Sequence, residues 1–230
     1  FGMGLALWAL VAWIWLRERN ALLRLAVSTA FVLGLFFCHL FAVGLYGLGL
    51  LAFEIHRVMV IYATRPKLRL ADFIGSQPPS PLVDLITASL PFWPVLPLLM
   101  MSPTWGLRTS FVWELSGKLD GLIYVIEVYN HFAAFLLTGI MAFAAGWGVR
   151  HRALQFHSFG WVLLILGAVV YFAMPRVIFE TYMADQRLPI SLAFTVIACA
   201  HLKLRHDYVR RGFATVLVLV LAIRVFEVQT

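Results

Sequence analysis

LLRLAVSTAFVLGLFFCHLFAVGLYGLGLLAFEIHRVMVI, residues 22–61, is the stretch that decides the fold, because only Arg24, Glu54 and Arg57 in it are charged. In lipid, every backbone polar group must be hydrogen-bonded within the protein, and a helix needs about 20 residues to cross. The stretch therefore predicts two membrane-spanning helices, at 22–38 and 40–61. Only a weak break at Cys38-His39 separates them, so a single long helix is the alternative.

The rest of the chain has the same character. Its 230 residues are 62% hydrophobic and 13% charged, whereas a soluble domain is about half apolar and about a quarter charged. This composition excludes a soluble enzyme, a disordered tail and a disulfide scaffold. Further spans are predicted at 2–16, 83–102, 121–148, 158–175, 188–202 and 212–228. We therefore expect an all-α protein, a polytopic transmembrane helix bundle of about eight spans with short loops.

The chain is expected to form a single transmembrane helical domain over residues 1–230. It opens on Phe1 rather than on methionine, and it closes on Thr230 only a few residues after an apolar run. We therefore interpret it as a fragment or a trimmed chain, truncated at both ends.

The basic residues indicate how the spans are oriented. Thirteen Lys and Arg follow the first, third, fifth and seventh spans, and four follow the second, fourth and sixth. Because cytoplasmic loops carry an excess of Lys and Arg, the odd-numbered loops should face the cytoplasm. This topology also explains the net charge of +7, so we expect membrane lipids and no nucleic acid as partners. The predicted location is a bacterial inner membrane, with several passes.

Two loops on the extracytoplasmic side, 103–120 and 176–187, mix acids, bases and aromatic residues. A site is therefore expected on that face. Arg176 and Arg187 can offer planar donors to a phosphate, while a neighbouring acid orients sugar hydroxyls. The alternative is structural, because an acid and an arginine that directly precede Pro189 can cap the helix that this proline begins.

Glu114 and Lys118, four residues apart, are a second candidate on the same side. They form either a pair that touches a substrate headgroup or a solvated ion pair on a helix surface.

Three polar residues, Glu127, Asn130 and His131, are spaced to share one helix face. If the helix at 121–148 is a full span, they lie below the outer surface, where an ionisable group indicates function. If the helix enters lipid only near residue 132, they lie at the interface at little cost. Both alternatives stay open.

Three prolines, Pro91, Pro94 and Pro97, interrupt the fourth span and predict a bent or broken helix between Leu90 and Leu98. Such a break either lines a cavity or makes a kinked packing helix. A further cavity candidate is His39, at the outer turn, where a packed or interfacial histidine is the alternative.

Metal and redox chemistry have no support in the sequence. Cys38 and Cys199 lie far apart in apolar runs, and no HExxH, Walker A, GxGxxG or CxxC pattern is present. We therefore expect no metal site and no cofactor.

Three stretches resemble the membrane domain of the GT-C superfamily, the polytopic glycosyltransferases that use polyprenyl-phosphate sugars. They are Cys38-His39-Leu40-Phe41-Ala42 leading to Glu54 and Arg57, Gly117-Lys118-Leu119-Asp120-Gly121-Leu122 leading to Tyr129-Asn130, and Asp185-Gln186-Arg187-Leu188-Pro189. The similarity is diffuse and extends over residues 20–205.

This resemblance implies that an acceptor hydroxyl displaces a polyprenyl phosphate at the outer face. The candidate acids are Asp185, Glu180 and Asp120. The residues that would hold the leaving phosphate are Arg176, Arg187 and Lys118. In that family the catalytic carboxylate usually lies in the first outer loop, and this chain has no such loop before residue 17. Either the catalytic part has been cut away, or the protein is not an active transferase.

Two other functions compete with this hypothesis. A transporter or lipid flippase would have its site near the bilayer midplane, at broken helices, and a structural subunit of a larger membrane complex would have none. Depth discriminates between them. Charges gathered at the outer boundary favour the enzyme, charges converging around the broken helix favour transport, and the absence of a cavity favours the structural subunit.

Overall fold

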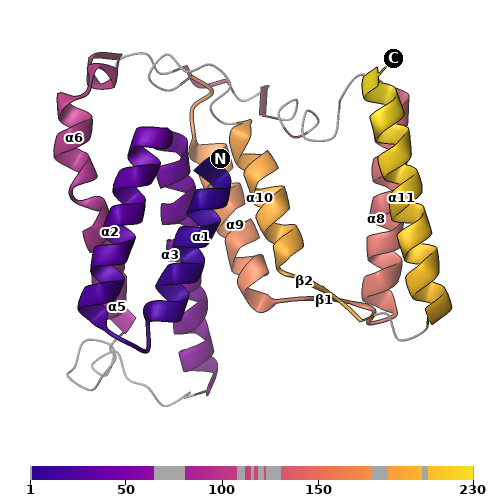
Figure 1. Ribbon diagram of the computed structural model, residues 1–230, viewed down its shortest axis with the longest axis horizontal. Helices are drawn as coiled ribbons and strands as arrows, with labels where there is room; N and C mark the ends of the chain where they lie inside the picture. The colour runs from indigo at the N-terminus through magenta and orange to yellow at the C-terminus, as the bar shows by residue number, and fades with distance from the viewer. Residues whose placement is uncertain are drawn as a thin grey trace.

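The computed structural model describes residues 2–64, 81–107, 112–114, 117–118, 122, 131–177, 186–203 and 207–229, and these residues are mostly helical (Figure 1). The helices and strands are α1 (Gly2–Leu16), α2 (Ala21–Cys38), α3 (Leu40–Thr64), α5 (Pro81–Ser89), η1 (Leu90–Phe92), α6 (Val95–Met101), η2 (Pro103–Leu107), α8 (His131–Arg150), β1 (Leu154–Phe156), α9 (Ser158–Ala173), α10 (Arg187–Ala198), β2 (Ala200–Leu202) and α11 (Asp207–Gln229).

Within the described residues, three helical stretches are long and apolar enough to cross a membrane: Ala21–Cys38, Leu40–Ile61 and Val83–Met101. Shorter apolar helices cover Gly2–Leu16, Ala134–Arg150, Ser158–Ala173 and Arg187–Ala198. The predictions of a mostly helical protein and of helices long and apolar enough to span a membrane are confirmed. The count of about eight spans stays a prediction.

The break between α2 and α3 falls at His39, whose backbone is extended (φ −175°, ψ 127°). The two helices pack against each other, with their connection at one end of the bundle (Figure 1). The alternative of one long helix is therefore wrong. At the other end of α2, the Asn20 side chain accepts hydrogen bonds from the backbone N–H groups of Leu22 and Leu23, at 2.9 and 3.3 Å. This is the ordinary way to satisfy the first N–H groups of a helix.

The proline-rich span is broken, as its sequence predicts. Helix α5 ends at Ser89, a 3₁₀ turn covers Leu90–Phe92, and α6 begins at Val95. The break packs against α3, because the Phe92 ring stacks on Tyr46 with 5.6 Å between ring centroids. Pro91 is buried in the same contact region. The break therefore serves packing at this point of the molecule.

The hydrophobic core lies among α1, α2, α3, α9 and α10, which pack in neighbouring pairs. Its largest side chains include Trp13, Leu35 and Tyr46, each at most 1% exposed. Helices α9 and α10 approach closely at Gly167, where an added Cβ would lie 2.4 Å from a methyl carbon of Leu192. Small residues permit such contacts between helices where lipid supplies no hydrophobic driving force.

Helices α8 and α11 lie apart from this core in Figure 1. The short antiparallel pair β1–β2 stands between them and α9 and α10, with Leu154 opposite Leu202 and Phe156 opposite Ala200. The pairing corrects one predicted boundary. The span at 188–202 ends as a helix at Ala198, because its last residues form β2.

The last helix begins at Asp207 rather than at residue 212, and Asp207 forms an ion pair with Arg210 in its first turn, at 3.1 Å. A carboxylate in the first turn favours a helix start. The predicted span at 121–148 corresponds to α8 over His131–Arg150, while most of 121–130 lies outside the described residues.

Figure 1 shows the helices alternating in direction, so that loops gather at two ends. We name the two ends according to the charge pattern of the loops. The end with His39 and Arg187 is called the outer end, and the end with Arg17 and Arg57 is called the inner end.

Candidate functional site

The outer end brings together two residues that the sequence singles out separately. Arg187 is the first residue of α10, and His39 is the residue between α2 and α3. The Arg187 guanidinium nitrogen Nη1 lies 2.7 Å from His39 Nε2. Both side chains are exposed. Because a guanidinium only donates, the imidazole nitrogen must accept in this contact.

Arg176 lies at the same end, just after α9. Its guanidinium donates a hydrogen bond of 2.6 Å to Glu114 Oε2 and forms an ion pair with it. The backbone brings the two segments together, because Val112 and Val177 form an antiparallel bridge and the Arg176 N–H donates to the Val112 carbonyl at 2.8 Å. The two charge-mixed loops are therefore neighbours where the structure describes them.

Gly117 makes room for this arrangement. A Cβ at this position would lie 1.9 Å from Nη1 of Arg176, far inside any permitted contact. Only a residue without a side chain lets the guanidinium rest against the backbone at this point.

Lys118 is held against the end of α9. Its side chain is buried, with the residue 1% exposed, and Nζ donates a 2.5 Å hydrogen bond to the Met174 carbonyl. The Tyr171 hydroxyl donates to the Lys118 carbonyl at 2.6 Å, and Nζ lies 4.9 Å from the centre of the Tyr171 ring. To hold a phosphate, as the resemblance implies, Lys118 would have to give up the bond to Met174.

Other predicted site residues lie outside the part of the chain that the structure describes: Asp120, Glu127, Asn130, Glu180 and Asp185. His131 begins α8, but its side chain is not described. The predicted meeting of Arg176, Asp185 and Arg187 in one cavity with Lys118 or Asp120 therefore stays a prediction.

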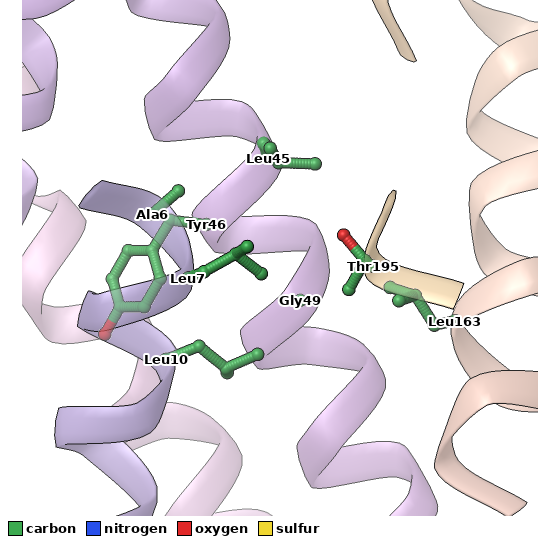
Figure 2. A pocket seen from close by; sticks show the side chains of 8 residues that line it. All are labelled: Ala6, Leu7, Leu10, Leu45, Tyr46, Gly49, Leu163 and Thr195. Carbon is green, nitrogen blue, oxygen red and sulfur yellow. The ribbon is translucent and has the colours of Figure 1, made fainter. Parts of the chain in front are cut away.

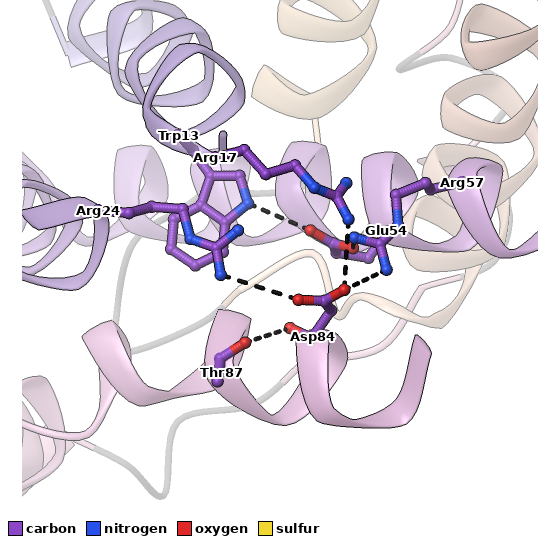
Figure 3. A network of polar contacts seen from close by, with 7 residues as sticks. All are labelled: Trp13, Arg17, Arg24, Glu54, Arg57, Asp84 and Thr87. Carbon is purple, nitrogen blue, oxygen red and sulfur yellow. Dashed lines mark hydrogen bonds and ion pairs between the residues drawn. The ribbon is translucent and has the colours of Figure 1, made fainter. Parts of the chain in front are cut away.

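The inner end holds a second polar site, which the sequence analysis did not predict. Figure 3 shows five charged side chains, from the turn after α1 and from α2, α3 and α5, converging on one point. We call them the arginine–carboxylate cluster: Arg17, Arg24, Glu54, Arg57 and Asp84.

Asp84 is the centre of the cluster. Its Oδ2 accepts hydrogen bonds from Arg57 and, at 3.3 Å, from Arg17. Its Oδ1 lies 3.8 Å from Nη2 of Arg24, close enough for an ion pair but too far for a hydrogen bond. The Thr87 hydroxyl donates to the Asp84 carbonyl at 2.9 Å, which ties the next turn of α5 to the same point.

Glu54 lies deepest in the cluster. Its side chain is 1% exposed, accepts a hydrogen bond from the Trp13 indole at 3.2 Å, and forms an ion pair with Arg57 at 3.2 Å. The Arg24 guanidinium lies over the other side of this indole, 4.3 Å from the ring centre. Removing one partner from such a buried set leaves a charge uncompensated, which typically costs about 3–5 kcal/mol.

The signal for this cluster was present in the sequence. Taken one at a time, Glu54 and Arg57 are explained by snorkelling and local pairing at a helix end, and Arg17 and Arg24 by the excess of basic residues after the first span. Charges in four separate apolar segments at one predicted end need partners from one another, since lipid offers none. Asp84, the acid at the start of the proline-rich span, is the residue that this argument would have found.

A small apolar cavity lies between α1, α3, α9 and α10 (Figure 2). It is lined by Ala6, Leu7, Leu10, Leu45, Tyr46, Gly49, Leu163 and Thr195. The cavity has room for about one water molecule, so it is far too small for a transported substrate. The lining is almost wholly apolar, so it offers no anchor for a charged ligand.

No family model, curated protein or solved structure matches this chain. The function is therefore argued from the two polar ends alone.

Proposed function

We propose that the chain is a polytopic membrane protein of about eight spans in a bacterial inner membrane. Its outer end forms part of a GT-C-like glycosyltransferase that acts on polyprenyl-phosphate-linked sugars. Support for eight passes comes from the alternating direction of the helices and from the positive-inside distribution of Lys and Arg.

The observation that carries the proposal is the pair of arginines at the outer end, each held by a residue from another segment. Arg187 contacts His39, and Arg176 contacts Glu114. A planar guanidinium with fixed orientation suits a phosphate that leaves with two negative oxygens. Glu114 is half exposed, so a donor phosphate can reach Arg176 by replacing this partner.

The reaction is a substitution at the anomeric carbon of the sugar. The acceptor oxygen forms a bond to this carbon while the bond to the phosphate oxygen breaks, and the polyprenyl phosphate leaves with the electron pair. A carboxylate takes the acceptor proton, for which Asp185, Glu180 and Asp120 are the candidates. Arg176 and Arg187 stabilise the charge that develops on the leaving phosphate.

The transporter alternative has less support. The α5–η1–α6 break is filled by the stacked rings of Phe92 and Tyr46, and the cavity between α1, α3, α9 and α10 is too small for a substrate. Charges gather at the two ends of the helices in the described residues, rather than around the break.

The test is sugar transfer in membrane vesicles that contain the full-length gene product. Polyprenyl-phosphate sugars labelled in the sugar are supplied, and both acceptor labelling and release of polyprenyl phosphate are measured. We expect transfer with the wild type and a loss of at least about tenfold with Arg187→Lys, because the planar fork is lost while the charge is kept. Arg210→Lys, on exposed α11, is the matched control.

Wild-type transfer by both Arg187→Lys and Arg176→Lys would remove the arginines from the site. No transfer by the wild type, with uptake or flipping of a lipid substrate in the same vesicles, would favour the transporter instead.

A further inference from the structure

Among the residues that the structure describes, the arginine–carboxylate cluster at the inner end holds more positive than negative side chains. It contains three guanidiniums, from Arg17, Arg24 and Arg57, and two carboxylates, from Glu54 and Asp84. Taken at their ordinary charges, these groups leave one positive charge in excess. An arginine stays protonated in proteins, so the excess cannot be removed by losing a proton.

Of the three arginines, Arg24 lies farthest from the Asp84 carboxylate. Its side chain is 6% exposed, yet its nearest described carboxylate oxygen lies 3.8 Å away, beyond hydrogen-bond distance. Its Nε has no hydrogen-bond partner among the described residues, and neither has Nε of Arg57. Buried donors of a charged group are costly to leave unsatisfied. A further acceptor of negative charge would satisfy them.

The surroundings indicate where such an acceptor comes from. Leu22 and Leu23, next to Arg24 on α2, are 77% and 47% exposed, so an acyl chain can cover them. Arg17 is the most exposed arginine of the cluster, with 20% of its side chain accessible, and stands at its rim. The charge pattern places this end at the cytoplasmic leaflet, whose anionic lipids bind basic pockets between helices.

We propose that the arginine–carboxylate cluster binds one phosphate group, that of an anionic lipid headgroup in the cytoplasmic leaflet, with Arg24 as the main donor and Arg17 at the rim. Asp84 and Glu54 orient the guanidiniums, and the phosphate supplies the missing negative charge. The site is separate from the proposed outer catalytic site and does not depend on it.

The test is lipid retention by the full-length protein. Purified protein in nanodiscs of phosphatidylcholine with increasing phosphatidylglycerol is released into a mass spectrometer, and bound lipids are counted. We expect the wild type to keep one phosphatidylglycerol in preference to phosphatidylcholine. Arg24→Gln should weaken this preference by about tenfold or more, as expected for loss of a charged hydrogen-bond donor.

Arg19→Gln is the matched control. Arg19 lies at the same end and loses the same charge, but it is exposed and rests on Trp15, with 4.1 Å to the ring centre, outside the cluster. It should keep the wild-type preference. Arg17→Gln serves as the second variant if Arg24→Gln does not accumulate, because its more exposed side chain can be replaced with less disruption.

A second arm separates a lipid from soluble phosphate. In pure phosphatidylcholine nanodiscs, inorganic phosphate is added and thermal unfolding is followed. Stabilisation by phosphate that Arg24→Gln abolishes supports the phosphate site, and together with a lack of phosphatidylglycerol preference it assigns a soluble ligand. Equal retention of both lipids and no response to phosphate would overturn the proposal and leave the cluster as a structural lock between helices.

Discussion

Arg187 and His39 are in contact across 148 positions of the chain, with 2.7 Å between guanidinium Nη1 and imidazole Nε2. The other ring nitrogen, Nδ1, lies 3.1 Å from the backbone N–H of Phe41. A neutral imidazole has only one nitrogen that can accept a hydrogen bond. The ring therefore accepts a hydrogen bond either from Arg187 or from the Phe41 N–H in the first turn of α3. A ligand that binds Arg187 in place of His39 leaves the ring free to accept the bond from Phe41.

His39→Leu should lower kcat and kcat/KM for transfer from the polyprenyl-phosphate donor by a similar factor of several-fold, because His39 orients Arg187, which stabilises the charge that develops on the leaving phosphate. Steady-state transfer kinetics in vesicles measure this, with His201→Leu on exposed β2 as the control. An unchanged kcat would show that Arg187 keeps its orientation without His39.

Gly117→Ala should impair transfer, because the new methyl group occupies the position of the Arg176 guanidinium. The flexible arginine can swing away, so membrane accumulation should stay near normal while the contact with Glu114 is lost. Gly106→Ala, where an added Cβ meets nothing within 4 Å, is the control. Equal activity of the two variants would argue against a role for the Arg176–Glu114 pair.

Asp84→Asn should destabilise the protein by about 3–5 kcal/mol, because three arginines lose their shared carboxylate. Thermal unfolding in detergent micelles measures the loss. Asp207→Asn removes the same charge from a side chain that is 77% exposed, and it should change stability by no more than about 1 kcal/mol. Similar values for the two variants would mean that the cluster contributes little to folding.

Gly167→Ala should destabilise by about 1–3 kcal/mol, because its methyl group would lie against Leu192 at 2.4 Å. The double variant with Leu192→Ala should recover part of this loss, since the overlapping methyl groups are gone. Gly139→Ala on α8, in open space, is the control. A neutral effect of Gly167→Ala would show that α9 and α10 can move apart without cost.

The orientation is tested by reporters fused at four loop positions. Fusions near Arg65 and Arg205 should report the cytoplasm, and fusions near Trp105 and Met183 should report the outer side, following the excess of Lys and Arg. The reverse pattern would exchange the two ends of the bundle. Both proposed sites would then face the wrong compartments.

The sequence predicted those features that depend on local chemistry. The first helix matches its predicted range, the helix break at His39 follows the weak interruption of apolar residues, and the fourth span is broken at Pro91 and Pro94. The strand at Ala200–Leu202 was not predicted, because its stability comes from hydrogen bonds to β1, whose paired residues lie 44 to 48 positions away in the chain. A short apolar run gives no local sign of such pairing.

The two candidate sites also differ in how far the local sequence predicts them. Arg176 and Arg187 could be chosen as candidates from the sequence because charged residues are rare in this chain, so each one can be recognised on its own. The cluster around Asp84 was not predicted because it forms only where four segments of the chain meet. The charged residues of each segment, taken alone, have an ordinary local explanation. The contact of Glu114 with Arg176 likewise depends on how the chain returns after α9.

The order of the cluster along the chain has a consequence for biogenesis. During synthesis, Arg17, Arg24 and Arg57 leave the ribosome before Asp84, and Glu54 is the one carboxylate of the cluster made with them. Their burial is therefore unfavourable until the fourth segment has been inserted and has joined the first three. A nascent chain that stops before Asp84 therefore contains all three arginines of the cluster but only one of its two carboxylates.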